Sequence, residues 1–186
     1  MNEWPSALAE AIMSRMLILR GNSGNYADEE GNPHKYTNGA LHDHAAMEYA
    51  RRHNYEPVVL DISGDPGTGP DRRSSPQTQW ALDWIAGDPE FAALYGFSGG
   101  AYNIYWIIRA LKENDLKRIE RIVVLGVDND VSESDYDKSK FPGARWTLVF
   151  KHNPPKDSSV IKKGAKPHMF GPEWLLLEEF GPGKKP

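Results

Sequence analysis

The chain of 186 residues contains no cysteine. This absence excludes disulfide bonds, catalysis by a cysteine thiolate and zinc sites built on cysteine ligands. Any nucleophile must therefore be sought among the hydroxyl, amine and carboxylate side chains. The length fits one domain, and we expect a single domain over residues 1–186, with its core at about 16–180 and a short flexible C-terminal tail.

Positive charge and long apolar runs are also scarce. Twenty-two Lys and Arg residues face 26 Asp and Glu residues, which gives a formal net charge of −4. We therefore expect no nucleic-acid partner, because phosphate binding depends on clustered basic side chains. No apolar run approaches the roughly 20 residues of a membrane span. The first ten residues contain no Lys or Arg, unlike a secretory signal, and we expect a cytoplasmic protein.

Apolar strands alternate with amphipathic or apolar helices along most of the chain. This alternation predicts an α/β fold, a three-layer α/β/α sandwich with a mostly parallel central sheet. A polar stretch at 22–38 is expected to be a long loop. The pattern predicts strands at 16–20, 57–62, 91–97, 121–127 and 145–150, and helices at 5–15, 39–53, 76–85, 99–114 and 172–180.

The most specific motif is Gly-Phe-Ser-Gly-Gly at 96–100. It joins the apolar strand 91–97 directly to the helix that starts at Gly99, which is the setting that a GxSxG nucleophile elbow requires. A sharp turn there would lift the Ser98 hydroxyl above the sheet, and the small flanking residues would let strand and helix approach each other. The N-terminus of the helix would stabilise an oxyanion. Ser98 is therefore the predicted nucleophile.

A nucleophilic serine needs a general base, and His168 is the preferred candidate. It precedes the last predicted helix, so its loop should lie at the same end of the sheet as Ser98. The base is also expected last in chain order in this kind of fold. His152, after the fifth strand, is the competing candidate. The remaining histidines fall in the polar loop or on the first long helix, where solvated surface positions are expected: His34, His42, His44 and His53.

The third member of a triad must accept a hydrogen bond from the base. Asp157 follows the fifth strand and precedes His168 by eleven residues, and it is favoured over Asp128 and Asp130, which follow the fourth strand. All three aspartates remain open at this point.

An oxyanion hole needs two backbone donors. The N–H of Gly99 is the first candidate. The second is expected from the Gly-rich loop 21–25, where Asn22 is preferred and Ser23 comes next.

With these features the chain resembles an α/β-hydrolase-fold serine hydrolase reduced to its central strands, similar in plan to cutinase-like esterases. The resemblance covers about 16–180 and lies in RGNSG at 20–24, the elbow at 96–100, Asp157, and PHMFG at 167–171. It implies hydrolysis of an ester, thioester or related acyl bond of a small-molecule substrate through an acyl-enzyme, with no metal or organic cofactor. The HGGG-type oxyanion motif of many lipases is missing.

A non-catalytic binding or interaction module on the same fold is the alternative, because a fold does not determine a function. Other sites are less well supported. His42 and His44 are two positions apart and would face different sides of a helix. The acidic segment 128–137 lacks an EF-hand pattern, and no P-loop or dinucleotide-binding motif is present. The sequence leaves the substrate, its acyl chain length and the oligomeric state open.

Overall fold

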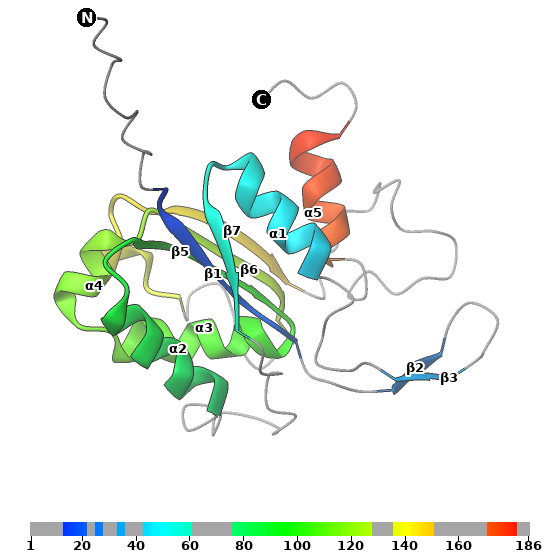
Figure 1. Cartoon of the computed structure of the whole chain (residues 1–186), viewed down its shortest axis with the longest axis horizontal. Coiled ribbons are helices and arrows are strands. Elements are labelled where there is room, and N and C mark those ends of the chain that lie inside the picture. Colours follow the sequence, from blue (N-terminus) through cyan, green and yellow to red (C-terminus); the bar gives the residue numbers. More distant parts are fainter. Residues whose placement is uncertain are drawn as a thin grey trace, which may run out of the picture.

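Five parallel strands form the central sheet in the order β4-β1-β5-β6-β7 (Figure 1). The structure is a computed structural model that describes residues 13–21, 25–27, 33–35, 43–60, 76–127, 136–150 and 171–181. The strands are β1 (Arg15–Leu19), β4 (Glu56–Val59), β5 (Phe91–Phe97), β6 (Arg121–Val127) and β7 (Arg145–Phe150). Every pairing within this sheet is parallel, as the apolar strands predicted.

Helices cover both faces of the sheet and complete the expected three-layer sandwich. In Figure 1, α1 and α5 lie side by side over one face, and α2 and α3 lie over the other. The helices are α1 (Asp43–Arg52), α2 (Pro76–Gly87), α3 (Gly99–Ala110), α4 (Glu113–Arg118) and α5 (Gly171–Phe180), with a short 3-10 helix, η4 (Lys138–Lys140). No helix in the described part of the chain is long and apolar enough to cross a membrane.

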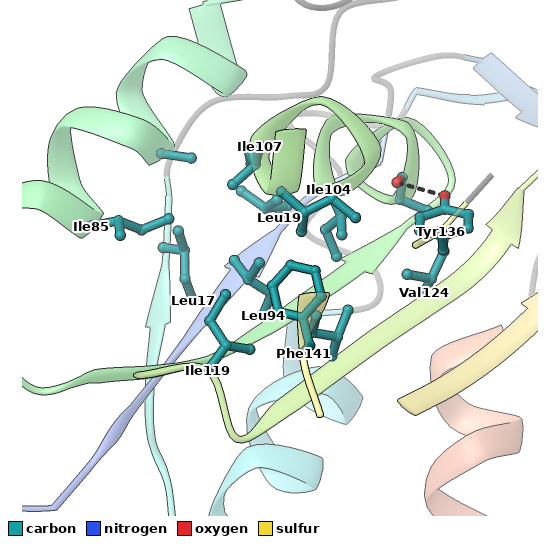
Figure 2. Packing of buried hydrophobic residues seen from close by; sticks show 14 of the residues in the cluster. Leu17, Leu19, Ile85, Leu94, Ile104, Ile107, Ile119, Val124, Tyr136 and Phe141 are labelled. Atoms are coloured by element: carbon teal, nitrogen blue, oxygen red, sulfur yellow. Dashed lines mark hydrogen bonds between the residues drawn. The ribbon is translucent and has the colours of Figure 1, made fainter. Parts of the chain in front are cut away.

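Two buried clusters hold the layers together, one on each face of the sheet. Beneath α2 and α3, leucines of β1 and β5 pack against isoleucines of these helices, as Figure 2 shows for Leu17, Leu94, Ile85 and Ile104. On the opposite face, side chains of β1 and β5 pack against α1 and α5. Strand β5 contributes to both clusters and is buried along its whole length. It is the central strand of the sheet, which explains why its sequence carries no alternation of polar and apolar residues.

The structure corrects three expectations about individual elements. The stretch 22–38 contains two short antiparallel strands, β2 (Asn25–Ala27) and β3 (Pro33–Lys35), where a loop was expected. The helix expected over 5–15 lies mostly outside the described residues, and its expected end is wrong because Arg15 already belongs to β1.

The helix expected over 99–114 is also wrong at its end, because α3 stops at Ala110 and α4 begins at Glu113. Leu111 and Lys112 between them are extended. Acidic side chains occupy the first turn of α4 and basic side chains its last turn, which is the charge distribution that favours a separate helix.

A polar cluster ties α1 and α5 to the start of β6. The Tyr49 hydroxyl donates to one carboxylate oxygen of Glu179 at 3.1 Å, and His53 Nε2 lies 2.7 Å from the other oxygen. Arg121, which is buried, donates to the Tyr49 hydroxyl at 3.1 Å. Burial alone would raise the pKa of Glu179, but hydrogen bonds from His53 and Tyr49 outweigh it and leave this pKa below its usual value. The ionised carboxylate is thus the form that the fold stabilises.

We predict that Glu179→Gln lowers the free energy of unfolding at pH 7 by about 1–2 kcal/mol, because it removes a charged hydrogen-bond acceptor from this cluster. Since the pKa of Glu179 is lowered in the folded state, its contribution is complete above the unfolded value of about 4.3 and is lost as the pH falls through the folded value. The difference between wild type and variant should therefore shrink at about pH 3.5. Urea unfolding at both pH values measures it.

The matched control is Glu178→Gln at the exposed neighbouring position on α5. This variant should change stability by less than about 0.5 kcal/mol. A Glu179→Gln difference that stayed constant from pH 7 to pH 3.5 would show that the carboxylate charge is not what the cluster stabilises.

Candidate active site

The sheet order places the junction between β5 and α3 at the position where open α/β sheets bind ligands. From the neighbours β1 and β5, successive strands are added in opposite directions, β4 on one side and then β6 and β7 on the other. Ligands bind outside the carboxyl ends of the strands at such a reversal point. Ser98 lies there, between the last residue of β5 and the first residue of α3.

The backbone of Ser98 is held in a conformation that serine rarely adopts. Its φ is 53° and its ψ is −116°. The only other described non-glycine residue with positive φ is Asn54, a residue type that tolerates this region. Such conformations cost about 1–3 kcal/mol and persist only where the surrounding structure imposes them. Here the Ser98 N–H donates to the carbonyl of Leu125 on β6 at 2.8 Å, which fixes the turn.

Ser98 does not serve the usual structural purpose of a serine at the start of a helix. Serine is favoured at this position because its hydroxyl accepts a hydrogen bond from the first turn. The Ser98 side chain makes no such capping bond to α3. Its side chain is partly exposed, whereas Phe97 and Gly99 on either side are buried. Ser98 is therefore a partly exposed residue at the sheet edge whose hydroxyl does not cap the helix.

Glycines are required on both sides of the turn, as the motif predicted. A Cβ on Gly96 would lie 2.6 Å from the carbonyl oxygen of Gly100, so the strand and the first turn of α3 touch through their backbones. A Cβ on Gly100 would overlap the carbonyl oxygen of Leu19 at the end of β1. These contacts are below any separation that real Cβ atoms show. The close approach of β1, β5 and α3 thus depends on the absence of side chains at both positions.

The end of β1 also packs directly against the serine. A Cβ on Gly21 would lie 3.2 Å from the Cβ of Ser98. The preceding residue, Arg20, is anchored by Asp43 at the start of α1 through a hydrogen bond of 2.8 Å from Nε. Both partners of this ion pair are mostly buried. The first residues after β1 are therefore tied to the serine on one side and to α1 on the other.

The start of α5 reaches the same edge of the sheet. A Cβ on Gly171 would lie 3.1 Å from the ring of Phe97, the residue before the serine. A small hollow there is bounded by Gly21, Asp43, Phe97 and Pro172. Gly21, which follows β1, and Gly171, the first residue of α5, therefore both lie against the elbow.

The structure brings together only part of the expected site. Ser98 and Gly99 lie at the strand–helix junction, where the first backbone hydrogen bonds of α3 run from the N–H groups of Ala101 and Tyr102 to the Ser98 carbonyl. The other expected members lie outside the described residues, and so do their competitors: His168, Asp157, Asn22, Ser23, His152, Asp128 and Asp130. Among the residues that are described, no three His, Asp or Glu side chains gather as metal ligands would.

Two histidines of the first long helix can be placed. His44 is exposed, as expected for a solvated position. His53 follows the last residue of α1 and is largely buried beside Glu179, so the expectation of a solvated His53 is wrong. Its ring also packs on Phe180, with centroids 4.9 Å apart. His53 is part of the α1–α5 cluster and has its own carboxylate partner there.

Sequence reasoning missed two buried amides near the serine. Gln77 of α2 and Asn103 of α3 are both 0% exposed. Asn103 donates to the side-chain oxygen of Gln77, and Gln77 Nε2 donates to the carbonyl of Arg20 at 3.1 Å. The signal was present in the sequence as a single amide in each apolar helix stripe.

No protein-family model matches the chain, and no curated protein matches it, so these comparisons assign neither a family nor an activity.

We predict that Gly100→Ala lowers the free energy of unfolding by about 3 kcal/mol, because the new methyl group meets backbone that cannot move aside. Gly87→Ala at the end of α2 is the control, since a Cβ placed there would meet no atom within 4 Å apart from the neighbouring backbone of its own helix. Alanine there should leave stability unchanged or raise it by up to about 1 kcal/mol. Urea unfolding compares the two, and equal effects would contradict the close packing at Gly100.

Proposed function

We propose that this protein is a serine hydrolase of the α/β-hydrolase type, with Ser98 as the nucleophile. One observation carries the proposal: Ser98 is held at φ 53° at the head of α3, yet its hydroxyl does not cap the helix. A strained backbone that presents an uncapped hydroxyl at the ligand-binding edge of the sheet is the arrangement of a nucleophile elbow.

In the proposed reaction, the Ser98 hydroxyl oxygen attacks the carbonyl carbon of an acyl substrate while a base takes its proton. The carbonyl π electrons move to oxygen, and the resulting oxyanion accepts hydrogen bonds from the N–H of Gly99 and from a second N–H, which we assign to Asn22. The N-terminal end of the α3 dipole favours the same negative charge. Collapse of the intermediate expels the protonated leaving group and leaves an acyl-serine.

Deacylation repeats these steps with water as the nucleophile. The base removes a proton from water, the hydroxide adds to the acyl carbon, and Ser98 recovers its proton as the acid departs. The balance requires only substrate and water. We propose His168 as the base and Asp157 as the carboxylate that orients it. The proposed substrate is a small molecule with an ester, thioester or related acyl bond, and the proposed location is the cytoplasm.

The contact between α5 and the elbow supports the choice of His168. Gly171 packs on Phe97, and His168 precedes Gly171 by three residues. Three residues span at most about 11 Å, so the chain keeps the His168 Cα within that distance of the Gly171 Cα. His53 is engaged by Glu179.

We predict that a fluorophosphonate probe labels Ser98 and that Ser98→Ala abolishes both labelling and hydrolysis of an activated ester such as p-nitrophenyl butyrate. The loss should be at least about 1000-fold, because no other group supplies the nucleophile. Intact-mass and peptide mass spectrometry locate the label, and circular dichroism checks the fold. Ser139→Ala, on the exposed helix η4, is the matched serine control.

An unlabelled wild-type protein, or an ester hydrolysis that survives Ser98→Ala, would overturn the hydrolase proposal. Specific binding of a small ligand at the elbow by such an unreactive protein would then support the non-catalytic binding module.

We predict that His168→Ala reduces labelling of Ser98 at least about 100-fold, whereas His152→Ala leaves it within about threefold, because only the base must remove the hydroxyl proton. Separate Asp157→Asn and Asp128→Asn variants assign the third member by the same assay. Asp157→Asn should reduce the rate and Asp128→Asn should not. A larger effect at His152 or Asp128 would reassign the corresponding role.

A further inference from the structure

The two buried amides beside the elbow form a hydrogen-bonded chain that ends on the carbonyl of Arg20, the residue after β1. Asn103 donates to the side-chain oxygen of Gln77, and the amide nitrogen of Gln77 donates to the carbonyl of Arg20 at 3.1 Å. The bond from Asn103 determines which end of the Gln77 amide faces Arg20, because an oxygen that accepts from Asn103 leaves the nitrogen to donate. These hydrogen bonds thus run from α3 through α2 to the residue after β1, with each amide donating to the next acceptor.

Each amide occupies a position that an apolar side chain would fill in an ordinary helix stripe. Gln77 is followed at helical spacing by Ala81 and Ile85, both fully buried, and Asn103 is followed by Ile107. Buried amides destabilise a core unless they are hydrogen-bonded, whereas apolar residues of similar volume need no partner. The amides are therefore better explained by what they hold than by the stability of the core.

What they hold is the peptide group between Arg20 and Gly21. This peptide is planar and trans, so a hydrogen bond that fixes its carbonyl also fixes the direction of the N–H on Gly21. A Cβ on Gly21 would lie 3.2 Å from the Cβ of Ser98, and a Cβ on Gly100 in the first turn of α3 would lie 2.8 Å from the Arg20 carbonyl oxygen. The orientation of this one peptide therefore sets how the chain leaves β1 beside the serine.

We infer that Gln77 is a positioning residue for the Ser98 reaction and that Asn103 orients it. The inference rests on the proposed function. By fixing the Arg20–Gly21 peptide, Gln77 holds the chain after β1 against the serine and determines where the Gly21 N–H points. A displacement of about 1 Å in such donors can reduce a rate about 100-fold. The effect belongs to the bond-forming step and not to the initial binding of the substrate.

The test compares Gln77→Met with Ile85→Val, two buried substitutions on the same face of α2. Methionine preserves the length of glutamine but neither donates to Arg20 nor accepts from Asn103. Two quantities are measured for each variant: backbone hydrogen exchange in the peptide that contains residues 17–21, and the kinetics of Ser98 labelling by a fluorophosphonate, separated into kinact and KI. Thermal unfolding shows whether the two variants are equally destabilised.

For Gln77→Met we expect exchange at the end of β1 to increase about tenfold and kinact to fall about 100-fold, with KI within about twofold. Ile85→Val should change none of these beyond about twofold. Should Gln77→Met fail to fold, Asn103→Ser replaces it, since this smaller polar side chain cannot reach Gln77 and should reproduce the fall in kinact in milder form.

Equal kinact in Gln77→Met and Ile85→Val would overturn the inference, and so would faster exchange without a fall in kinact. Failure of the proposed function is recognised separately, because wild-type protein would then take up no label at Ser98. A labelled wild type with an unaffected Gln77→Met variant contradicts the positioning role alone.

Discussion

The backbone contact between the first turn of α3 and the end of β1 is the constraint on which the rest of the site depends. Gly100 has no side chain, so the helix approaches the carbonyl groups of Leu19 and Arg20 directly. The same turn must also receive the end of β5, where Gly96 allows the second close approach. Three backbones then converge on one residue, Ser98. Its unusual dihedral angles are the consequence of this convergence, and the hydrogen bond to Leu125 on β6 holds it in place.

The strain that this convergence imposes on Ser98 is tolerated because both faces of the sheet are well packed. Leucines and isoleucines beneath α2 and α3 form one cluster, and the side chains beneath α1 and α5 form the other. Burial of such side chains contributes about 1.5–3 kcal/mol each, so the sum over the two clusters far exceeds the cost of about 1–3 kcal/mol for one strained residue. The packing of its buried side chains against the sheet holds helix α3 in place independently of its N-terminal turn. The serine can be strained because neither neighbouring element is free to relax it.

Much of this architecture could be predicted from residue patterns. The run at 91–97 has no charged side chain, as expected of a central parallel strand, and GxSxG at its end identified the turn. The end of α3 was mispredicted because apolar residues such as Leu111 continue past it. The acidic start of α4 was the better signal. The short pairing of β2 with β3 has too few apolar residues to show the alternation that predicts strands.

The Gln77–Asn103 chain illustrates why the site could be predicted only in part. Periodicity treats both positions as core, and an amide in an apolar stripe reads as a minor irregularity until its partner is known. The two residues are 26 positions apart, and their target, Arg20, is 57 positions from Gln77. Only the sheet order brings β1 beside β5, and only the glycines bring α3 onto the Arg20 carbonyl. A local motif can identify the strand–turn–helix junction that holds Ser98, because these three pieces are contiguous in sequence. The groups that position it come from separate elements, and only the packing of those elements brings the groups together.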